Sequence, residues 1–117
     1  MSSVEDQIQE IEQNIKESRK TVDFGDALVR LHSNRDFKRV IVEGFFAEEA
    51  IRLVHLKSDA NMQTPEKQQS ILSQIDAIGS LKQYFKTAMF KADLARKSIA
   101  FDEQTREELT EGDADGR

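Results

Sequence analysis

The first 22 residues repeat apolar side chains in a heptad pattern. Val4, Ile8, Ile11, Ile15 and Val22 follow one another at intervals of 4, 3, 4 and 7 residues, and almost every other position is polar. This spacing predicts an α-helix with one narrow apolar stripe, which is typical of a helix that contacts a single other helix. Such a helix is marginal in water by itself. We therefore expect an N-terminal arm that pairs with another helix.

Gly25 interrupts the pattern and predicts a hinge after the arm. Glycine costs up to ~1 kcal/mol inside a helix, and Asp23 or Asp26 can cap a new helix start. The sequence therefore predicts a separate short helix, with Leu28 and Leu31 on its inner face.

Two longer helices are predicted to follow. A helix over residues 35–57 is expected to begin at a cap formed by Ser33 or Asn34. Thr64 before Pro65 is a strong start signal for a helix that extends to about residue 100, because proline needs no hydrogen bond in a first turn. The predicted fold is all-α, a helical hairpin of two long antiparallel helices that follows the N-terminal heptad-patterned helix.

The middle helix carries more apolar surface than one partner helix can cover. Phe37 and Phe46 are nine residues apart, which places them about half a turn from each other on a straight α-helix. One partner covers a stripe little more than ~100° wide. Either the helix bends at Gly44, or a second partner covers a face formed by Phe46, Ala50 and Leu53.

The negative charge of the chain is concentrated at its C-terminal end. The 117 residues carry a net charge of −5, and all of this excess lies in residues 102–117, where seven acids meet two bases. A segment rich in Asp, Glu and Gly buries too little apolar surface to offset its ordering entropy. We expect three parts: an arm (1–24), a hairpin body (25–101) and an acidic tail (102–117) that is mobile unless a partner holds it. The neutral body lacks the basic patch expected of a nucleic-acid-binding protein.

No arrangement of residues indicates catalysis. The chain has no cysteine, and His32 and His55 are its only histidines, so no metal site of the usual ligand spacing is present. Glu48 and Glu49 are adjacent and diverge on a helix, which argues against a paired-carboxylate site. The chain contains the tripeptide DFG at 23–25, which binds magnesium in protein kinases, but it lacks every other kinase signature. We expect no enzymatic activity, no cofactor and no metal.

The sequence also lacks the features of a membrane or secreted protein. No apolar run approaches the ~18 residues needed to span a bilayer. The polar start lacks the basic and apolar regions of a signal peptide. A soluble cytoplasmic protein is expected.

The stretch LHSNRDFKRVIVEGFFAEEAIRLV, followed after a loop by QQSILSQIDAIGSLKQYF, resembles small helical structural and assembly proteins of tailed bacteriophages. The resemblance covers about residues 28–90 and includes no catalytic motif. The residues that carry it are Leu31, Asn34, Asp36, Phe37, Val40, Ile41, Gly44, Phe45, Ala50, Leu53, Ile71, Ile75, Ile78, Leu81 and Tyr84. It implies a virion component or assembly factor, present in the host cytoplasm and then in the virion.

The pattern and the resemblance together favour a non-enzymatic virion structural or assembly protein, such as a capsid or neck component. Its partners would be copies of itself or larger virion proteins. The residues expected at protein interfaces are Ile8, Ile11, Ile15, Phe46, Ala50 and Leu53.

Two other functions remain compatible with the sequence. One is a small acidic regulatory or inhibitory protein that binds a DNA-handling or host enzyme through its tail. The other is a DNA-packaging accessory that contacts phosphates through the basic residues of the last helix, which are Lys82, Lys86, Lys91, Arg96 and Lys97.

Overall fold

The computed structural model describes residues 3–115, and it confirms the all-α class and the helical hairpin. These residues contain no strand. The elements in chain order are α1 (Val4–Ser33), α2 (Arg35–Phe37), the π-helix η1 (Lys38–Glu49), α3 (Ala50–Lys57), the 3₁₀-helix η2 (Ala60–Met62) and α4 (Pro65–Asp115).

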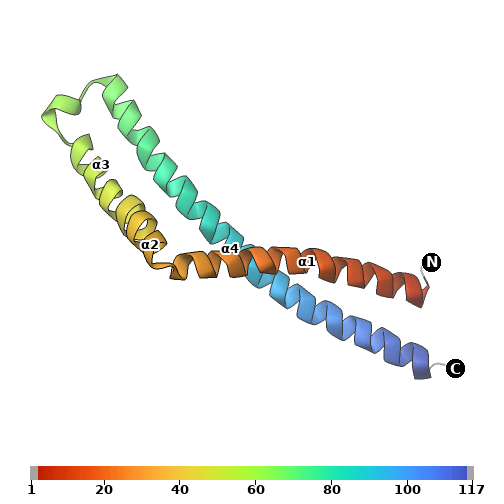
Figure 1. Cartoon of the computed structure of the whole chain (residues 1–117). Helices are drawn as coiled ribbons and strands as arrows, with labels where there is room; N and C mark the ends of the chain where they lie inside the picture. The colour runs from red at the N-terminus through yellow and green to blue at the C-terminus, as the bar shows by residue number, and fades with distance from the viewer. Residues whose placement is uncertain (1–2, 116–117) are drawn as a thin grey trace. The chain divides into compact units, whose positions relative to one another are not determined.

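The chain divides into two compact units. The first unit consists of Met1–Ala27 and Ala88–Arg117, and the second unit is Leu28–Thr87. Within each unit, α4 lies side by side with an earlier part of the chain that runs in the opposite direction (Figure 1). The residues expected to form the arm and those expected to form the acidic tail thus belong to the same unit.

α1 is continuous through Gly25, so the predicted hinge is wrong. Gly25 is buried, and a Cβ atom placed on it would lie only 2.2 Å from Cβ of Ala92 on α4. The glycine therefore lets the two helices approach closely, and this packing overrides its low helix propensity. Further along α1, Leu28 is buried as expected, whereas Leu31 is 40% exposed instead of facing inward.

The helix starts follow local capping chemistry. The side-chain oxygen of Asn34 accepts a hydrogen bond from the backbone N–H of Phe37 at 2.9 Å, so Asn34 and not Ser33 is the cap. The hydroxyl of Ser33 instead donates to a backbone carbonyl one turn earlier. At the start of α4, the hydroxyl of Thr64 accepts from the N–H of Lys67 at 3.3 Å, which confirms the predicted start.

The middle helix is wider than an α-helix over most of its length. In a π-helix such as η1, each N–H bonds to the carbonyl five residues earlier, so successive residues turn by less than the ~100° of an α-helix. The carbonyl oxygen of Arg39, five residues before Gly44, lies 3.3 Å from the position of a Cβ on that glycine. The smaller rotation per residue brings Phe37 and Phe46 to the same side of the helix, which makes a second partner for Phe46 unnecessary.

The second unit has a core between the middle helix and α4. Its fully buried residues are Leu53, Ile71 and Ile78. The apolar residues that pack against them are Phe45, Phe46, Ala50, Leu56, Met62 and Ile75. The predicted pairing of residues 35–57 with the last helix is therefore present.

The close contact at Gly25 can be tested with two Gly→Ala substitutions. The added Cβ of Gly25→Ala must displace Ala92, and overpacking of this kind costs about 1–3 kcal/mol. Gly79 is the matched control, because it lies inside α4 with no atom within 4 Å of the added Cβ. Gly79→Ala should raise the free energy of unfolding by about 0.5–1 kcal/mol through helix propensity alone. Urea denaturation measures both effects.

A compensating variant distinguishes steric conflict from other causes. Gly25→Ala combined with Ala92→Gly moves the methyl group from one helix to the other and should regain part of the lost stability. If Gly25→Ala stabilises the chain as Gly79→Ala does, the helices do not approach closely at this point.

Candidate protein-interaction surfaces

The apolar set expected on a second face of the middle helix lies in the core of the second unit. Leu53 is 0% exposed, and Phe46 and Ala50 are half-buried and pack against the core it belongs to. The expectation of an outward-facing surface at these residues is therefore corrected. The physical reason is the width of η1, since the projection that separated these residues from the core assumed α-helical rotation throughout.

An aromatic cluster, formed by His32, Phe37, Phe46 and Phe85, closes one end of this unit's interior. The Phe85 ring centre lies 5.1 Å from that of His32, 5.9 Å from that of Phe37 and 6.1 Å from that of Phe46. All three contacts are edge-to-face, the arrangement in which the positive edge of one ring meets the negative face of another. Phe45 also contacts Phe46, at 5.9 Å. The adjacent residues Phe45 and Phe46 are thus both packed against the core of the unit.

The two histidines have structural surroundings. His32 lies in the last turn of α1, and its Nδ1 is 2.9 Å from the carbonyl oxygen of Leu28, to which it donates. His55 lies in the last turn of α3 and is exposed. Among the described residues, no group of three His, Asp or Glu side chains is placed to hold a metal ion.

In the first unit, α4 has its own heptad of buried and half-buried positions. Ala92 is 1% exposed and Ala95 is 8% exposed, and they face α1, where Ile15 is 2% exposed. The positions alternate at intervals of four and three residues: Ala88, Ala92, Ala95, Ile99, Asp102, Arg106 and Leu109. Sequence reasoning missed this partner of the arm because the positions are mostly small or charged. Their spacing was the signal that could have revealed it.

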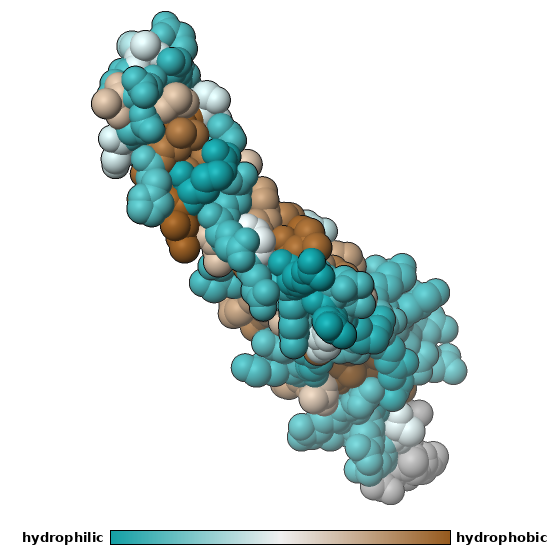
Figure 2. Space-filling model, turned by 60° about the vertical axis from the view of Figure 1, so that its left-hand side comes forward, coloured by the Kyte–Doolittle hydropathy of each residue, from teal (hydrophilic) through white to brown (hydrophobic). Residues whose placement is uncertain are grey.

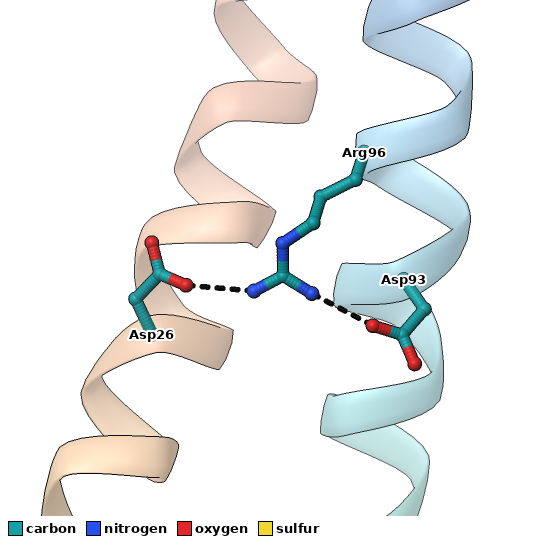
Figure 3. A network of polar contacts seen from close by, with 3 residues as sticks. All are labelled: Asp26, Asp93 and Arg96. Atoms are coloured by element: carbon teal, nitrogen blue, oxygen red, sulfur yellow. Dashed lines mark hydrogen bonds and ion pairs between the residues drawn. The ribbon is translucent and has the colours of Figure 1, made fainter.

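An ion-pair network joins the two helices beside the close contact. Arg96 of α4 reaches Asp26 of α1 at 2.6 Å and Asp93 of its own helix at 2.7 Å (Figure 3). These side chains are more than 40% exposed, so each pair is worth at most about 1 kcal/mol. The network therefore contributes more to the direction and register of pairing than to stability.

The acidic segment is part of α4 and is held against α1. Arg19 of α1 pairs with Glu103 at 3.3 Å, and Glu12 pairs with Arg106 at 4.0 Å. As residue numbers fall along α1 they rise along α4, so the pairing is antiparallel. The tail was expected to be mobile unless a partner holds it, and within the described residues that partner is α1 of the same chain. Residues 116 and 117 of the predicted tail lie outside the described residues.

The arm isoleucines are covered to different extents. Ile15 is buried, whereas Ile8 and Ile11 are only half-buried. Counting the same number of residues from the close contact at Gly25 along each antiparallel helix places Ile11 opposite Arg106. A charged side chain covers an isoleucine poorly, so part of the arm's apolar surface stays accessible.

Large apolar side chains remain exposed along the described part of the chain. Eleven of them are at least 40% exposed, compared with seven buried hydrophobic residues. The exposed ones are Phe24, Val29, Leu31, Val40, Ile51, Val54, Leu72, Tyr84, Phe90, Leu94 and Phe101. Figure 2 shows apolar groups reaching the surface among the polar ones. Where such groups form a contiguous patch they mark a contact surface, whereas singly scattered ones are normal.

The basic residues of α4 are partly engaged within the chain. Arg96 forms the network described above, and the ammonium group of Lys82 lies 5.9 Å from the centre of the Phe46 ring. A shallow groove in the first unit is lined by four bases and two acids, and three of the bases already form ion pairs. Its lining is Glu12, Ile15, Lys16, Arg19, Lys20, Asp23 and Arg106. Neither feature concentrates positive charge for a nucleic acid.

Comparison with protein-family models, curated proteins and solved structures finds no match to this chain. Within the described residues, no helix has an apolar stretch long enough to cross a bilayer.

Phe85 should be the most important ring in the aromatic cluster. Phe85→Ala removes its contacts with His32, Phe37 and Phe46, and because Phe85 is half-buried we expect a loss of roughly 2–3 kcal/mol, below the cost at a fully buried site. Phe90→Ala on the same helix is the control, since Phe90 is 62% exposed and, at a concentration at which the chain is a monomer, should change stability by less than about 0.5 kcal/mol. Equal losses in thermal unfolding would contradict the central role of Phe85.

The ion pair between Glu49 and Arg52 should make stability depend on acidic pH. The hydrogen bond from Arg52 lowers the pKa of the Glu49 carboxyl below its usual 4.5, which desolvation partly opposes. A lowered folded-state pKa contributes stability that is present above the unfolded pKa and is lost as pH falls through the folded pKa. The stability difference between wild type and Glu49→Gln should thus be positive near neutral pH and vanish in strong acid.

Glu48→Gln serves as the control for this titration, because Glu48 is exposed and forms no ion pair. Its stability difference from wild type should stay small across the same range. A Glu49→Gln effect that persists in strong acid would show that its origin is not the carboxylate charge.

Proposed function

We propose that this chain is a non-enzymatic assembly protein that acts through helix-mediated contacts with copies of itself and with larger proteins. The observation that carries the proposal is that eleven large apolar side chains are exposed among the described residues, whereas five are buried, together with Ala92 and Ala95. Burying such groups is the main favourable term in protein association. The helices that present them are held by internal cores, so the contact surfaces are preformed.

The half-buried isoleucines of α1 support a contact surface on the arm. Ile8 and Ile11 lie on the stripe that faces α4, and the position opposite Ile11 carries Arg106 and not an apolar side chain. An approaching helix or strand can cover their accessible part without unfolding the first unit. The arm can thus pair within the chain and still contribute apolar surface to a partner.

The setting we propose is a virion, with the chain as a capsid or neck component or as an assembly factor. Its support is the resemblance of residues 28–90 to small helical proteins of tailed bacteriophages. The helical hairpin agrees with that resemblance in architecture. Helices with apolar groups on their surface are suited to contacts between larger subunits.

One feature favours a second candidate, an acidic regulatory protein. Glu107, Glu108 and Glu111 lie exposed on α4 and form no ion pair. A helix that presents three exposed carboxylates outside any ion pair can occupy a basic site on another protein. In that case the carboxylates, and not the apolar groups, would carry the interaction.

Light scattering at a series of concentrations tests assembly. The mass should rise above the 13.4 kDa of one chain as concentration increases. Ile11→Asp should weaken association at least about tenfold, which corresponds to ~1.4 kcal/mol, while circular dichroism stays unchanged. Asn14→Asp, at an exposed α1 position outside the heptad stripe, adds the same charge and should have little effect. A strict monomer at every concentration would contradict self-assembly.

A charge-neutral variant separates the two candidates. Replacing Glu107, Glu108 and Glu111 with glutamine keeps the helix and removes the three negative charges. An assembly protein should retain its oligomer, because its apolar contacts are intact. Loss of association in this variant would favour the acidic regulatory function.

A further inference from the structure

α4 carries a second apolar stripe in the first unit, separate from the positions that face α1. Phe90, Leu94 and Phe101 are 62%, 49% and 68% exposed. At ~100° per residue these three fall within roughly 40° of one another, and they lie about 150° around the helix from the positions that face α1. The stripe is therefore on the outer side of α4, where no part of the described first unit covers it.

The stripe has the dimensions of a helix-packing surface. From Phe90 to Phe101 it extends about 16 Å, or three helical turns. Lys97 lies between Leu94 and Phe101, and its aliphatic stem can extend the apolar surface while the ammonium group stays in water. Because the opposite face of the helix is already packed, this face is free to contact a helix of a second copy.

We propose that this stripe binds the same stripe of a second copy, with the two α4 helices antiparallel and Phe90 of one copy beside Phe101 of the other. The proposal adds a second self-contact surface, besides the arm isoleucines, to the assembly function given above, and it rests on that function. In this arrangement a two-fold axis passes between Leu94 and Lys97, and the contact is isologous, the commonest form in homodimers.

The charge distribution along α4 selects the antiparallel direction. After Phe101 the helix carries Glu107, Glu108 and Glu111, none of which forms an ion pair. Parallel pairing would place these acids beside those of the second copy, and like charges side by side are unfavourable. Antiparallel pairing separates the two acidic segments and directs each toward the end of the partner's stripe that carries Lys91.

Cysteine cross-linking can show whether the two α4 helices pair parallel or antiparallel. The chain contains no cysteine, so each introduced cysteine is the only one in its variant. Phe90→Cys and Phe101→Cys are made separately, mixed and oxidised. In the antiparallel dimer the two cysteines adjoin, and the other Phe90–Phe101 contact of the same pair stays intact. The mixture should form a disulfide-linked dimer that contains one copy of each variant, whereas each variant alone should form little or none.

Two controls keep the result interpretable. Ala100→Cys places a thiol at an exposed position about 100° from Phe101 on the same helix, and it should not cross-link in any mixture. Circular dichroism of every variant should match that of the wild type. Disulfides of Phe90→Cys with itself and of Phe101→Cys with itself would indicate parallel pairing and overturn the proposal.

The outcomes also separate this inference from the proposed function. If light scattering shows oligomers of the wild type but the mixed variants do not cross-link, copies associate through another surface or through the arm. The stripe proposal then fails while the assembly function stands. If the wild type is a monomer at every concentration, both fail.

Discussion

The second unit depends on the packing of Phe37 and Phe46 against one ring, Phe85. The three rings approach edge to face at about 6 Å, and His32 completes the group from the end of α1. This contact requires that two side chains nine residues apart share one side of a helix. An α-helix cannot provide that, and the wider η1 does. With the rings on one side, the apolar surface of the middle helix is directed into the core around Leu53, and α4 alone is enough to cover it.

The first unit meets a different constraint, because its helices come together over small side chains. Gly25 and Ala92 allow an approach that any larger residue would prevent, and exposed ion pairs beside them set direction and register. Small residues leave little apolar area in the interface, so the unit keeps large groups such as Phe90 and Phe101 on its outer side. Because small side chains form the contact between α1 and α4, the large apolar side chains on the outer side of the unit stay available for a contact with another protein. This links the packing of α1 on α4 to the proposed assembly function.

Features set by local chemistry could be predicted from the sequence, whereas those set by tertiary packing could not. The start of α4 after Thr64 and the pairing of the middle helix with α4 follow from capping and periodicity, and both are present. Gly25 was interpreted as a hinge because propensity counts only the helix itself, while its role lies in the contact with Ala92. The assignment of Leu53 to an outer face failed because helix width is not visible in the spacing of residues.

The interaction surface can lie outside the middle helix only if Phe46 packs inside the second unit. Nuclear Overhauser effects between aromatic rings test this position most directly. In a sample with selectively labelled phenylalanines, Phe85 should show cross-peaks to both Phe37 and Phe46. Cross-peaks from Phe85 to Phe37 alone would mean that the middle helix is an ordinary α-helix with Phe46 on its outer side. That result would contradict the account and return the contact surface to Phe46 and its neighbours.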